Sequence, residues 1–166
     1  MNWYDLAKYA AQIVPFNEED DGEDDERLGM DRYDAMDQAD KAFQASGVRY
    51  DSRKRISQMA IEDGKVIGAV ASGWSTEDGD EKDTAVFSFD IAVKPEFRGP
   101  AMVGMKLIAA AMQHYKYEAS QYREMGFNTL MRLRVINPRL VPVLEKKFGF
   151  ELESSHGDGS AHMIMY

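Results

Sequence analysis

The sequence predicts a single domain of the α+β or mixed-sheet α/β class. Some segments carry apolar residues at three- and four-residue steps, whereas others alternate or run continuously apolar, so both helices and strands are expected. The two kinds of segment follow one another along the chain without an internal repeat or a low-complexity linker. A length of 166 residues fits one domain, 1–166, with a sizeable core.

The N-terminal part, 1–55, is expected to be helical and acidic. Residues 3–14 have the apolar spacing of one helical face, and Pro15 follows them. Residues 31–46 repeat this spacing, and Gly47 is suited to end a second helix. The apolar face expected for the second helix comprises Tyr33, Met36, Ala39 and Phe43.

An acidic run, EEDDGEDDE at 18–26, separates the two expected helices and contributes much of the net charge of -9. Such a run predicts a solvated loop. A calcium site is the alternative, but the alternating oxygen ligands and closing glutamate of an EF-hand loop are missing. The negative charge argues against direct nucleic-acid binding, because phosphate contact needs a concentrated basic surface.

The remaining core, 56–166, is expected to alternate strands and helices. Residues 57–75 predict two strands joined at Asp63-Gly64, a strong tight-hairpin signal. Residues 84–93 form the most apolar strand candidate. The further expected elements are a long helix at 102–125, a strand at 127–136, a short helix at 138–148 and two closing strands at 150–154 and 161–166.

The junction VKPEFRGPAMVGMKLI, residues 93–108, predicts an anion site. A strand leads through a loop containing Arg98 and Gly99 into a helix, whose first turn leaves backbone N–H groups unpaired and carries a partial positive charge. A phosphate or pyrophosphate would satisfy both features. The Walker A and dinucleotide-binding patterns do not occur here.

Two segments together resemble the GNAT superfamily of N-acetyltransferases: DIAVKPEFRGPAMVGMKLI, and LRVINPRLVPVLEKKFGFELE some thirty residues later. The resemblance covers about 57–166. It implies a GNAT-like fold, in which helices flank a central twisted mixed sheet and the two N-terminal helices and the acidic loop form the variable part.

The resemblance also implies acetyl-CoA as cosubstrate, and no metal. The loop from Arg98 to Gly104 would hold the pyrophosphate through its backbone amides, with Gly99, Ala101 and Val103 among its residues. The main chain of Ile91 and Val93 would bind the pantetheine arm, for which a splayed strand pair makes room. Asn137 would lie beside the cofactor arm.

The loop departs from the family pattern at three positions. Pro100 removes one N–H donor, Ala101 replaces a glycine, and Gly104 lies one residue later than an ungapped alignment requires. Either the loop has one extra residue, or Val103 occupies the family's small position and would crowd a pyrophosphate.

Two carboxylates are the candidate catalytic residues. Transfer to an amine needs a group that takes a proton from the ammonium form, and Asp90 matches a position that is often acidic in the family. Its alternative role is that of a strand residue facing solvent or capping a turn. Glu145 stands where many members carry a tyrosine, and it could act as an acid only if burial raised its pKa; otherwise it is a solvated helix residue.

The histidines and the large aromatic residues have structural roles by default. His114, His156 and His162 lack a metal-ligand spacing and are expected at the surface. Core packing is expected for the aromatic residues, and Trp74, next to a polar loop, could instead line an acceptor pocket. The sequence contains no cysteine, which excludes disulfides, cysteine-ligated zinc and thiol catalysis.

The first functional hypothesis is therefore an acetyltransferase acting on a primary amine, of a cationic small molecule or of a protein. The second is a GNAT-fold binding or structural protein that no longer catalyses, such as a bacteriophage accessory or virion-associated protein. A third is an acidic decoy that engages a basic partner through 18–26. No signal peptide or long apolar run is evident, so a cytoplasmic protein without membrane contact is expected, and a homodimer is compatible with it.

Overall fold

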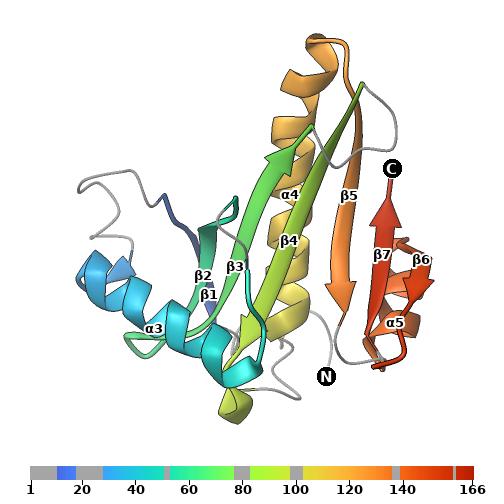
Figure 1. Cartoon of the computed structure of the whole chain (residues 1–166). Helices are drawn as coiled ribbons and strands as arrows, with labels where there is room; N and C mark the ends of the chain where they lie inside the picture. The colour runs from blue at the N-terminus through green and yellow to red at the C-terminus, as the bar shows by residue number, and fades with distance from the viewer. Residues whose placement is uncertain are drawn as a thin grey trace. The chain divides into compact units, whose positions relative to one another are not determined.

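The computed structural model describes residues 11–17, 28–50, 53–76, 83–97, 103–135, 139–158 and 160–166. The described strands form a seven-stranded sheet in the order β1-β2-β3-β4-β5-β7-β6 (Figure 1). β4 and β5 pair in parallel, whereas β1–β2, β2–β3, β5–β7 and β6–β7 are antiparallel. The mixed sheet with helices confirms the predicted fold class.

The elements, in chain order, are β1 (Gln12–Pro15), α3 (Arg32–Ser46), β2 (Arg55–Glu62), β3 (Lys65–Ser75), β4 (Thr84–Val93), the 3₁₀ turn η1 (Pro95–Phe97), α4 (Val103–Glu124), β5 (Asn128–Val135), α5 (Leu140–Val143), the π-helical turn η2 (Leu144–Phe148), β6 (Glu151–Ser155) and β7 (Ala161–Met165).

The described residues belong to two compact units. Unit 1 lies within Met1–Ser72 and Asp90–His114, and unit 2 lies within Gly73–Phe89 and Tyr115–Tyr166. Each unit is described by itself below. The prediction of one domain divided at residue 55 stays a prediction.

In unit 1, α3 forms where the sequence predicts the second helix. The Asp31 carboxylate accepts a hydrogen bond from the Tyr33 backbone N–H, and Gly47 ends the helix with a φ of 70°. The predicted apolar face is only partly right, because Tyr33 is exposed. The helix instead buries a row of small residues, Ala35, Ala39 and Ala42, with Phe43 beside them.

The small residues of α3 pack on one face of the β1–β3 strands. Val14 of β1, Ile56 of β2 and Ala69 of β3 belong to the same hydrophobic cluster. A polar contact fixes the register of helix and sheet, since Gln38 Oε1 accepts a hydrogen bond of 2.8 Å from the Val66 N–H.

The first half of α4 lies against the other face of these strands. A Cβ atom at Gly68 would lie 3.1 Å from Leu107 Cδ1, and Gln58 Nε2 donates to the Ala110 carbonyl at 3.1 Å. Unit 1 therefore has its strands between two helical layers.

The β2–β3 hairpin confirms the prediction at Asp63-Gly64. Both residues have positive φ, 50° and 72°, as a two-residue turn of type I′ requires. The turn ends β2 at Glu62 and starts β3 at Lys65.

The helix predicted at 3–14 is wrong in the part of that segment that the structure describes. Residues 3–10 lie outside the described residues, but Gln12–Pro15 form strand β1, paired with β2 from Gln12↔Ile61 to Pro15↔Gln58. The β-branched pair Ile13-Val14 suits a strand. Pro15, which was expected to stop a helix, stands at the end of an edge strand, where its missing N–H is tolerated.

In unit 2, the second half of α4 packs on an aromatic core. The Trp74 ring stacks on Tyr122 and Tyr115 with centroids 4.3 and 5.6 Å apart, and it also contacts Phe87. Core packing is therefore confirmed for Tyr115, whereas Trp74 contacts the same aromatic residues but is only half-buried, and its role in an acceptor pocket stays a prediction. The prediction of core packing is wrong for Tyr117, which is 72% exposed.

The other predicted elements of the core are confirmed with small shifts of their ends. The long helix ends at Glu124, close to Gly126 with its φ of 93°. The short C-terminal helix consists of α5 followed by η2, which ends at Gly149 with a φ of 78°. In the part of the chain that is described, no helix is long and apolar enough to cross a membrane.

Candidate functional site

The predicted strand–loop–helix junction lies in unit 1. β4 ends at Val93, η1 follows, and α4 begins at Val103. The two ends of the junction are close, because a Cβ atom at Gly104 would lie 3.8 Å from Val93 Cγ2. Arg98, Gly99, Pro100 and Ala101 lie outside the described residues, as does Asn137.

The start of α4 has the charge pattern of an anion site. Its first turn contains Lys106 and no acidic residue, and the preceding RGPAM segment contains none either. The unpaired N–H groups and the partial positive charge at this end of a 22-residue helix are thus not compensated by an acidic side chain of the first turn.

The two glycine alternatives of the loop can now be compared. Val103 is only 2% exposed, so its side chain belongs to the core and does not project outward from the helix start. Gly104 has open surroundings, with Val93 as the one neighbour of its added Cβ among the described residues. Which of the two takes the family's small position stays a prediction, because 98–102 lie outside the described residues.

The main-chain N–H and C=O groups at the end of β4 point alternately toward β3 and away from it. The Lys94 N–H donates to the Ile67 carbonyl at 2.8 Å. Because main-chain groups alternate along a strand, those of Ile91 and Val93 point to the opposite edge. At that edge Ser46 of α3 donates to the Val93 carbonyl at 3.1 Å, so this predicted ligand already has a protein partner.

The parallel pairing of β4 and β5 stops before β4 does. Cα partners run from Thr84↔Asn128 to Phe89↔Leu133, whereas β4 continues to Val93. Ile91 and Val93, the predicted pantetheine ligands, therefore lie in the part of β4 that follows the last described pair. Their role stays a prediction.

Neither of the two environments expected for Asp90 is the one observed. Its side chain is 7% exposed, and Oδ2 lies 2.7 Å from Nζ of Lys54, which is 16% exposed. Asp90 neither faces solvent nor caps a turn. A carboxylate held this closely by an ammonium group is engaged in an ion pair, which makes it a poor candidate for a general base.

Glu145 does not meet the condition set for a general acid. It is exposed in the π-helical turn η2. The role depended on burial of the carboxyl group, so the interpretation as a solvated helix residue fits the structure.

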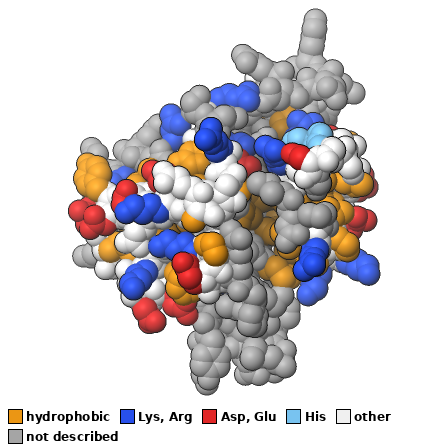
Figure 2. Space-filling model, turned by 60° about the horizontal axis from the view of Figure 1, so that its bottom comes forward, with side chains coloured by type: hydrophobic (Ala, Val, Ile, Leu, Met, Phe, Trp, Pro, Cys, Tyr) orange, Lys and Arg blue, Asp and Glu red, His pale blue; other side chains and the backbone are white. Residues whose placement is uncertain are grey.

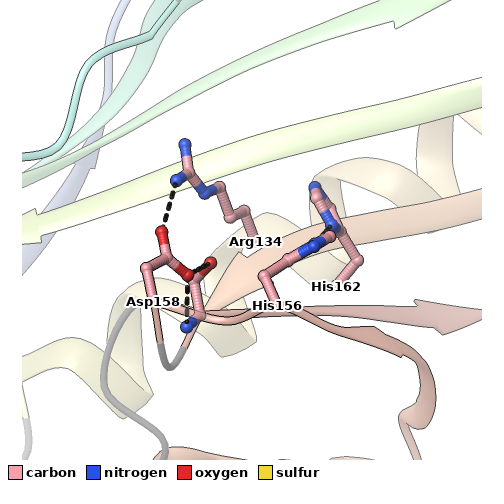
Figure 3. A network of polar contacts seen from close by, with 5 residues as sticks. Arg134, His156, Asp158 and His162 are labelled. Atoms are coloured by element: carbon pink, nitrogen blue, oxygen red, sulfur yellow. Dashed lines mark hydrogen bonds and ion pairs between the residues drawn. The ribbon is translucent and has the colours of Figure 1, made fainter.

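A polar cluster in unit 2 was not foreseen from the sequence. Arg132 and Arg134 lie two residues apart on β5 and therefore share one face of the sheet. His162 of β7 is the Cα partner of Arg134. Figure 3 shows Arg134 and His162 beside the β6–β7 turn, where His156 Nε2 lies 2.7 Å from His162 Nδ1.

The arginines of this cluster contact carboxylates. Arg132 Nη2 lies 3.0 Å from Glu153 Oε2, and Arg134 Nη2 lies 3.9 Å from Asp158 Oδ2. We call the face formed by Arg132, Arg134, Glu153 and His162 the polar face of unit 2.

Two pKa values are displaced in the cluster. Burial lowers the pKa of His162, as do the charges of His156, Arg132 and Arg134, whereas Glu153 raises it. The pKa of Asp158 is lowered chiefly by hydrogen bonds from the Ser160 side chain and N–H. The environment of His162 thus favours its neutral imidazole form.

No spacing rule could have found this pair, because His156 and His162 meet only when β6 and β7 fold back as a hairpin. On the face seen in Figure 2, histidine side chains lie at the surface beside basic and acidic ones. Among the described residues, no three His, Asp or Glu side chains gather in a way that could hold a metal ion.

The fold is that of the GNAT acetyltransferases. An acyl-CoA N-acyltransferase from Pseudomonas aeruginosa is similar over 95% of this chain and 100% of its own, with a TM-score of 0.56 and 12% identity. Naa50 from Arabidopsis thaliana, solved with the bisubstrate analogue CoA-Ac-MVNAL, is similar over 95% and 99%, with a TM-score of 0.55 and 13% identity.

ElaA from Escherichia coli is similar over 94% of this chain and 99% of its own, with a TM-score of 0.55 and 13% identity. No family model matches the sequence, and the search of curated proteins found no match. The likeness is therefore one of fold, and it spans almost the whole of each chain.

Proposed function

We propose that the protein is an N-acetyltransferase that moves acetyl from acetyl-CoA to a primary amine. The observation that carries this proposal is the likeness of fold along nearly the whole chain, to proteins that include an acyl-CoA N-acyltransferase and one solved with a CoA bisubstrate analogue. The uncompensated N-terminus of α4 gives it a physical basis, since CoA carries a pyrophosphate.

Each part of the junction would have its own task. The amides from Arg98 to Gly104 and the first turn of α4 would hold the pyrophosphate. The main chain of Ile91 and Val93 would hold the pantetheine arm, with the Val93 carbonyl exchanging its hydrogen bond from Ser46 for one from the arm. Asn137 would lie beside that arm. Catalysis would then rest mainly on holding the thioester and the amine in attack geometry.

Calorimetric titration of the whole chain with acetyl-CoA and desulfo-CoA tests the proposal. We expect both to bind, and Gly99→Asp to abolish binding, because its carboxylate would stand against the pyrophosphate. Gly157→Asp is the matched control, since a Cβ at Gly157 has nothing within 4 Å among the described residues. No binding at millimolar ligand would overturn the proposal.

The acceptor is proposed to be a cationic amine of a small molecule or a protein. A net charge of -9 steers cations toward the surface. An amine panel with an acetyl-CoA assay tests this class: faster turnover of polyamines and lysine-rich peptides than of anionic amines is expected, and the reverse order would contradict it. A cytoplasmic location and a homodimer stay predictions.

One observation favours a second candidate, a GNAT-fold protein that binds without catalysing. The Lys54–Asp90 ion pair occupies the carboxylate that was expected to act as a base. Binding of acetyl-CoA with no acetylation of any amine in the panel would favour this candidate over the enzyme. A bacteriophage origin stays a prediction.

A further inference from the structure

The end of the β6–β7 hairpin in unit 2 contains a hydrogen bond that only some protonation states allow. His156 Nε2 lies 2.7 Å from His162 Nδ1, and the two rings stand at 90° with centroids 4.8 Å apart (Figure 3). One imidazole nitrogen must donate and the other must accept. The bond can therefore exist while at least one ring is neutral, and it breaks when both rings are protonated.

A β-bulge brings a carboxylate to the same place. The register of β6 and β7 shifts between Leu152 and Ser154, so Glu153 is an extra residue in β6. Bulges redirect side chains. Here the Glu153 carboxylate lies on the polar face of unit 2, where its Oε2 accepts a hydrogen bond of 3.0 Å from Arg132 Nη2. Its negative charge also acts on the imidazole of His162.

The surroundings of His162 oppose a second proton on the histidine pair. His162 is half-buried in β7, whereas His156 is exposed in the turn. Burial lowers the pKa of His162, as do the positive charges of its neighbours, whereas Glu153 raises it. The other charged side chains of β5, β6 and the turn are Arg132, Arg134, Glu151 and Asp158. The second proton is therefore expected to bind below the ordinary histidine value of 6.5.

The turn itself is held by bonds that do not involve the imidazoles. Asp158 Oδ1 accepts hydrogen bonds from the Ser160 N–H at 2.9 Å and from the Ser160 hydroxyl at 2.6 Å. The backbone N–H of His156 donates to the Ser160 carbonyl at 2.8 Å. The bonds from Ser160 lower the pKa of Asp158 from its ordinary value of 3.8. The turn should therefore keep these bonds in the pH range in which the histidines take up protons.

We propose that this end of the hairpin is a pH-sensitive switch between two side-chain arrangements. While one imidazole is neutral, His162 bonds to His156, and Glu153 bonds to Arg132. When both imidazoles are protonated, the His156 ring turns away to solvent and His162 takes Glu153 as its partner, while the turn stays closed. The added protons change the charge and the shape of the polar face of unit 2. The switch needs no ligand, so it is independent of acetyl-CoA binding.

The first test is an NMR titration of the whole chain without ligand. The sequence has three histidines, so the variants His114→Gln, His156→Gln and His162→Gln assign every imidazole signal. We expect a nuclear Overhauser effect between the rings of His156 and His162 at neutral pH, and its loss once His162 has titrated below pH 6.5. An Overhauser effect that persists after both rings are protonated would overturn the switch.

The variant His156→Gln tests the coupling of the two rings. His156 is exposed, so its replacement should not disturb folding, and glutamine takes up no proton. The pKa of His162 should rise in this variant, because the charge of His156 lowers it in wild type. His114→Gln, on α4 of unit 1, is the control and should leave the titration of His162 unchanged. An unchanged pKa of His162 in His156→Gln would contradict the coupling.

The variant Glu153→Gln tests the second partner. The pKa of His162 should fall further in this variant, because Glu153 raises it in wild type, and the loss of the Overhauser effect should move to lower pH. Glu151→Gln is the matched control, since Glu151 is an exposed glutamate of the same strand. Equal shifts in the two variants would rule out Glu153 as the specific partner of the imidazolium.

Amide hydrogen exchange separates the switch from local unfolding. The His156 N–H reports on the turn, and the Asn128 N–H, which donates to the Asp83 carbonyl at 2.8 Å in the same unit, is the internal reference. The ratio of their protection factors should stay constant in wild type between neutral pH and the end of the histidine titration. A ratio that falls as the histidines titrate would show that the turn opens, and would overturn the switch as proposed.

Discussion

Gly68 lies where two strands and a helix of unit 1 approach one another. A Cβ atom at this position would lie 2.8 Å from the Ala92 carbonyl oxygen and 3.1 Å from Leu107 Cδ1. Backbone cannot yield as a flexible side chain can, so Gly68→Ala should destabilise the protein by about 1–3 kcal/mol. The free energy of unfolding in urea measures this effect.

Gly104→Ala is the matched control for this substitution. Its Cβ would make only an ordinary contact, 3.8 Å from Val93 Cγ2, and alanine favours a helix over glycine. Stability should stay equal or rise by up to about 1 kcal/mol. Equal loss of stability in both variants would contradict the packing argument.

The Lys54–Asp90 ion pair gives a second prediction at this scale. Lys54→Met leaves a buried carboxylate without its partner, which should cost about 3 kcal/mol. The double variant Lys54→Met/Asp90→Leu removes both charges and should recover most of that loss. Urea denaturation of the two variants checks the pair; a double variant as unstable as the single one would show that packing, and not charge, is at stake.

The site residues differ in how far the sequence could predict them. The helix start at Val103 and Gly104 follows from a local pattern, and the structure agrees with it. The environments of Asp90 and Glu145 could not be predicted from local patterns. That of Asp90 depends on its ion pair with Lys54, 36 positions earlier in the chain. That of Glu145 depends on whether the folded chain buries its side chain. Local sequence does not encode the partner of a buried charge.

At the scale of elements, α3 is a helix whose two ends can be predicted from its own sequence. Its N-cap is Asp31, whose Oδ1 accepts from the Tyr33 N–H at 3.1 Å, and Gly47 takes the left-handed conformation after its last turn. Cap residues act locally. This is why both ends were predicted within one residue.

Asp31→Ala should therefore cost about 1 kcal/mol of stability, the usual value of an N-cap carboxylate. Asp34→Ala is the control, since Asp34 is also acidic and exposed in the first turn but is not the cap. It should cost no more than about 0.5 kcal/mol through the helix dipole. Thermal unfolding of both variants measures the difference, and equal losses would count against a capping role.

β1 shows the opposite case, an element whose type its own sequence did not determine. Its residues fit a helical face as well as a strand, and the pairing from Gln12↔Ile61 to Pro15↔Gln58 decides between them. A short segment at a sheet edge gains its hydrogen bonds from a distant strand, so periodicity within the segment is a weak guide.

At the scale of the whole molecule, stability should depend on pH through His162. Its pKa is lowered in the folded state, so the unfolded chain binds a proton that the folded chain does not. The stability is fully present above about pH 6.5, the ordinary value, and decreases as the pH falls toward the folded pKa. Asp158 acts in a separate window, below its ordinary value of 3.8.

Urea midpoints measured between pH 7.5 and pH 5 check this dependence. Wild type should lose stability across the range, and His162→Gln should lose less, because glutamine takes up no proton. If the urea midpoint of His162→Gln changed with pH as that of wild type does, other groups would control stability in this pH range.

The sequence by itself determined the fold class, the second helix, the β2–β3 hairpin, the long helix and the strand–loop–helix junction. Each of these depends on periodicity, capping or turn chemistry within a short segment. The tertiary structure alone decided that residues 12–15 form an edge strand, that Asp90 pairs with Lys54 and that His156 meets His162. These contacts join residues through strand pairing and burial, which are properties of the folded chain and not of any one segment.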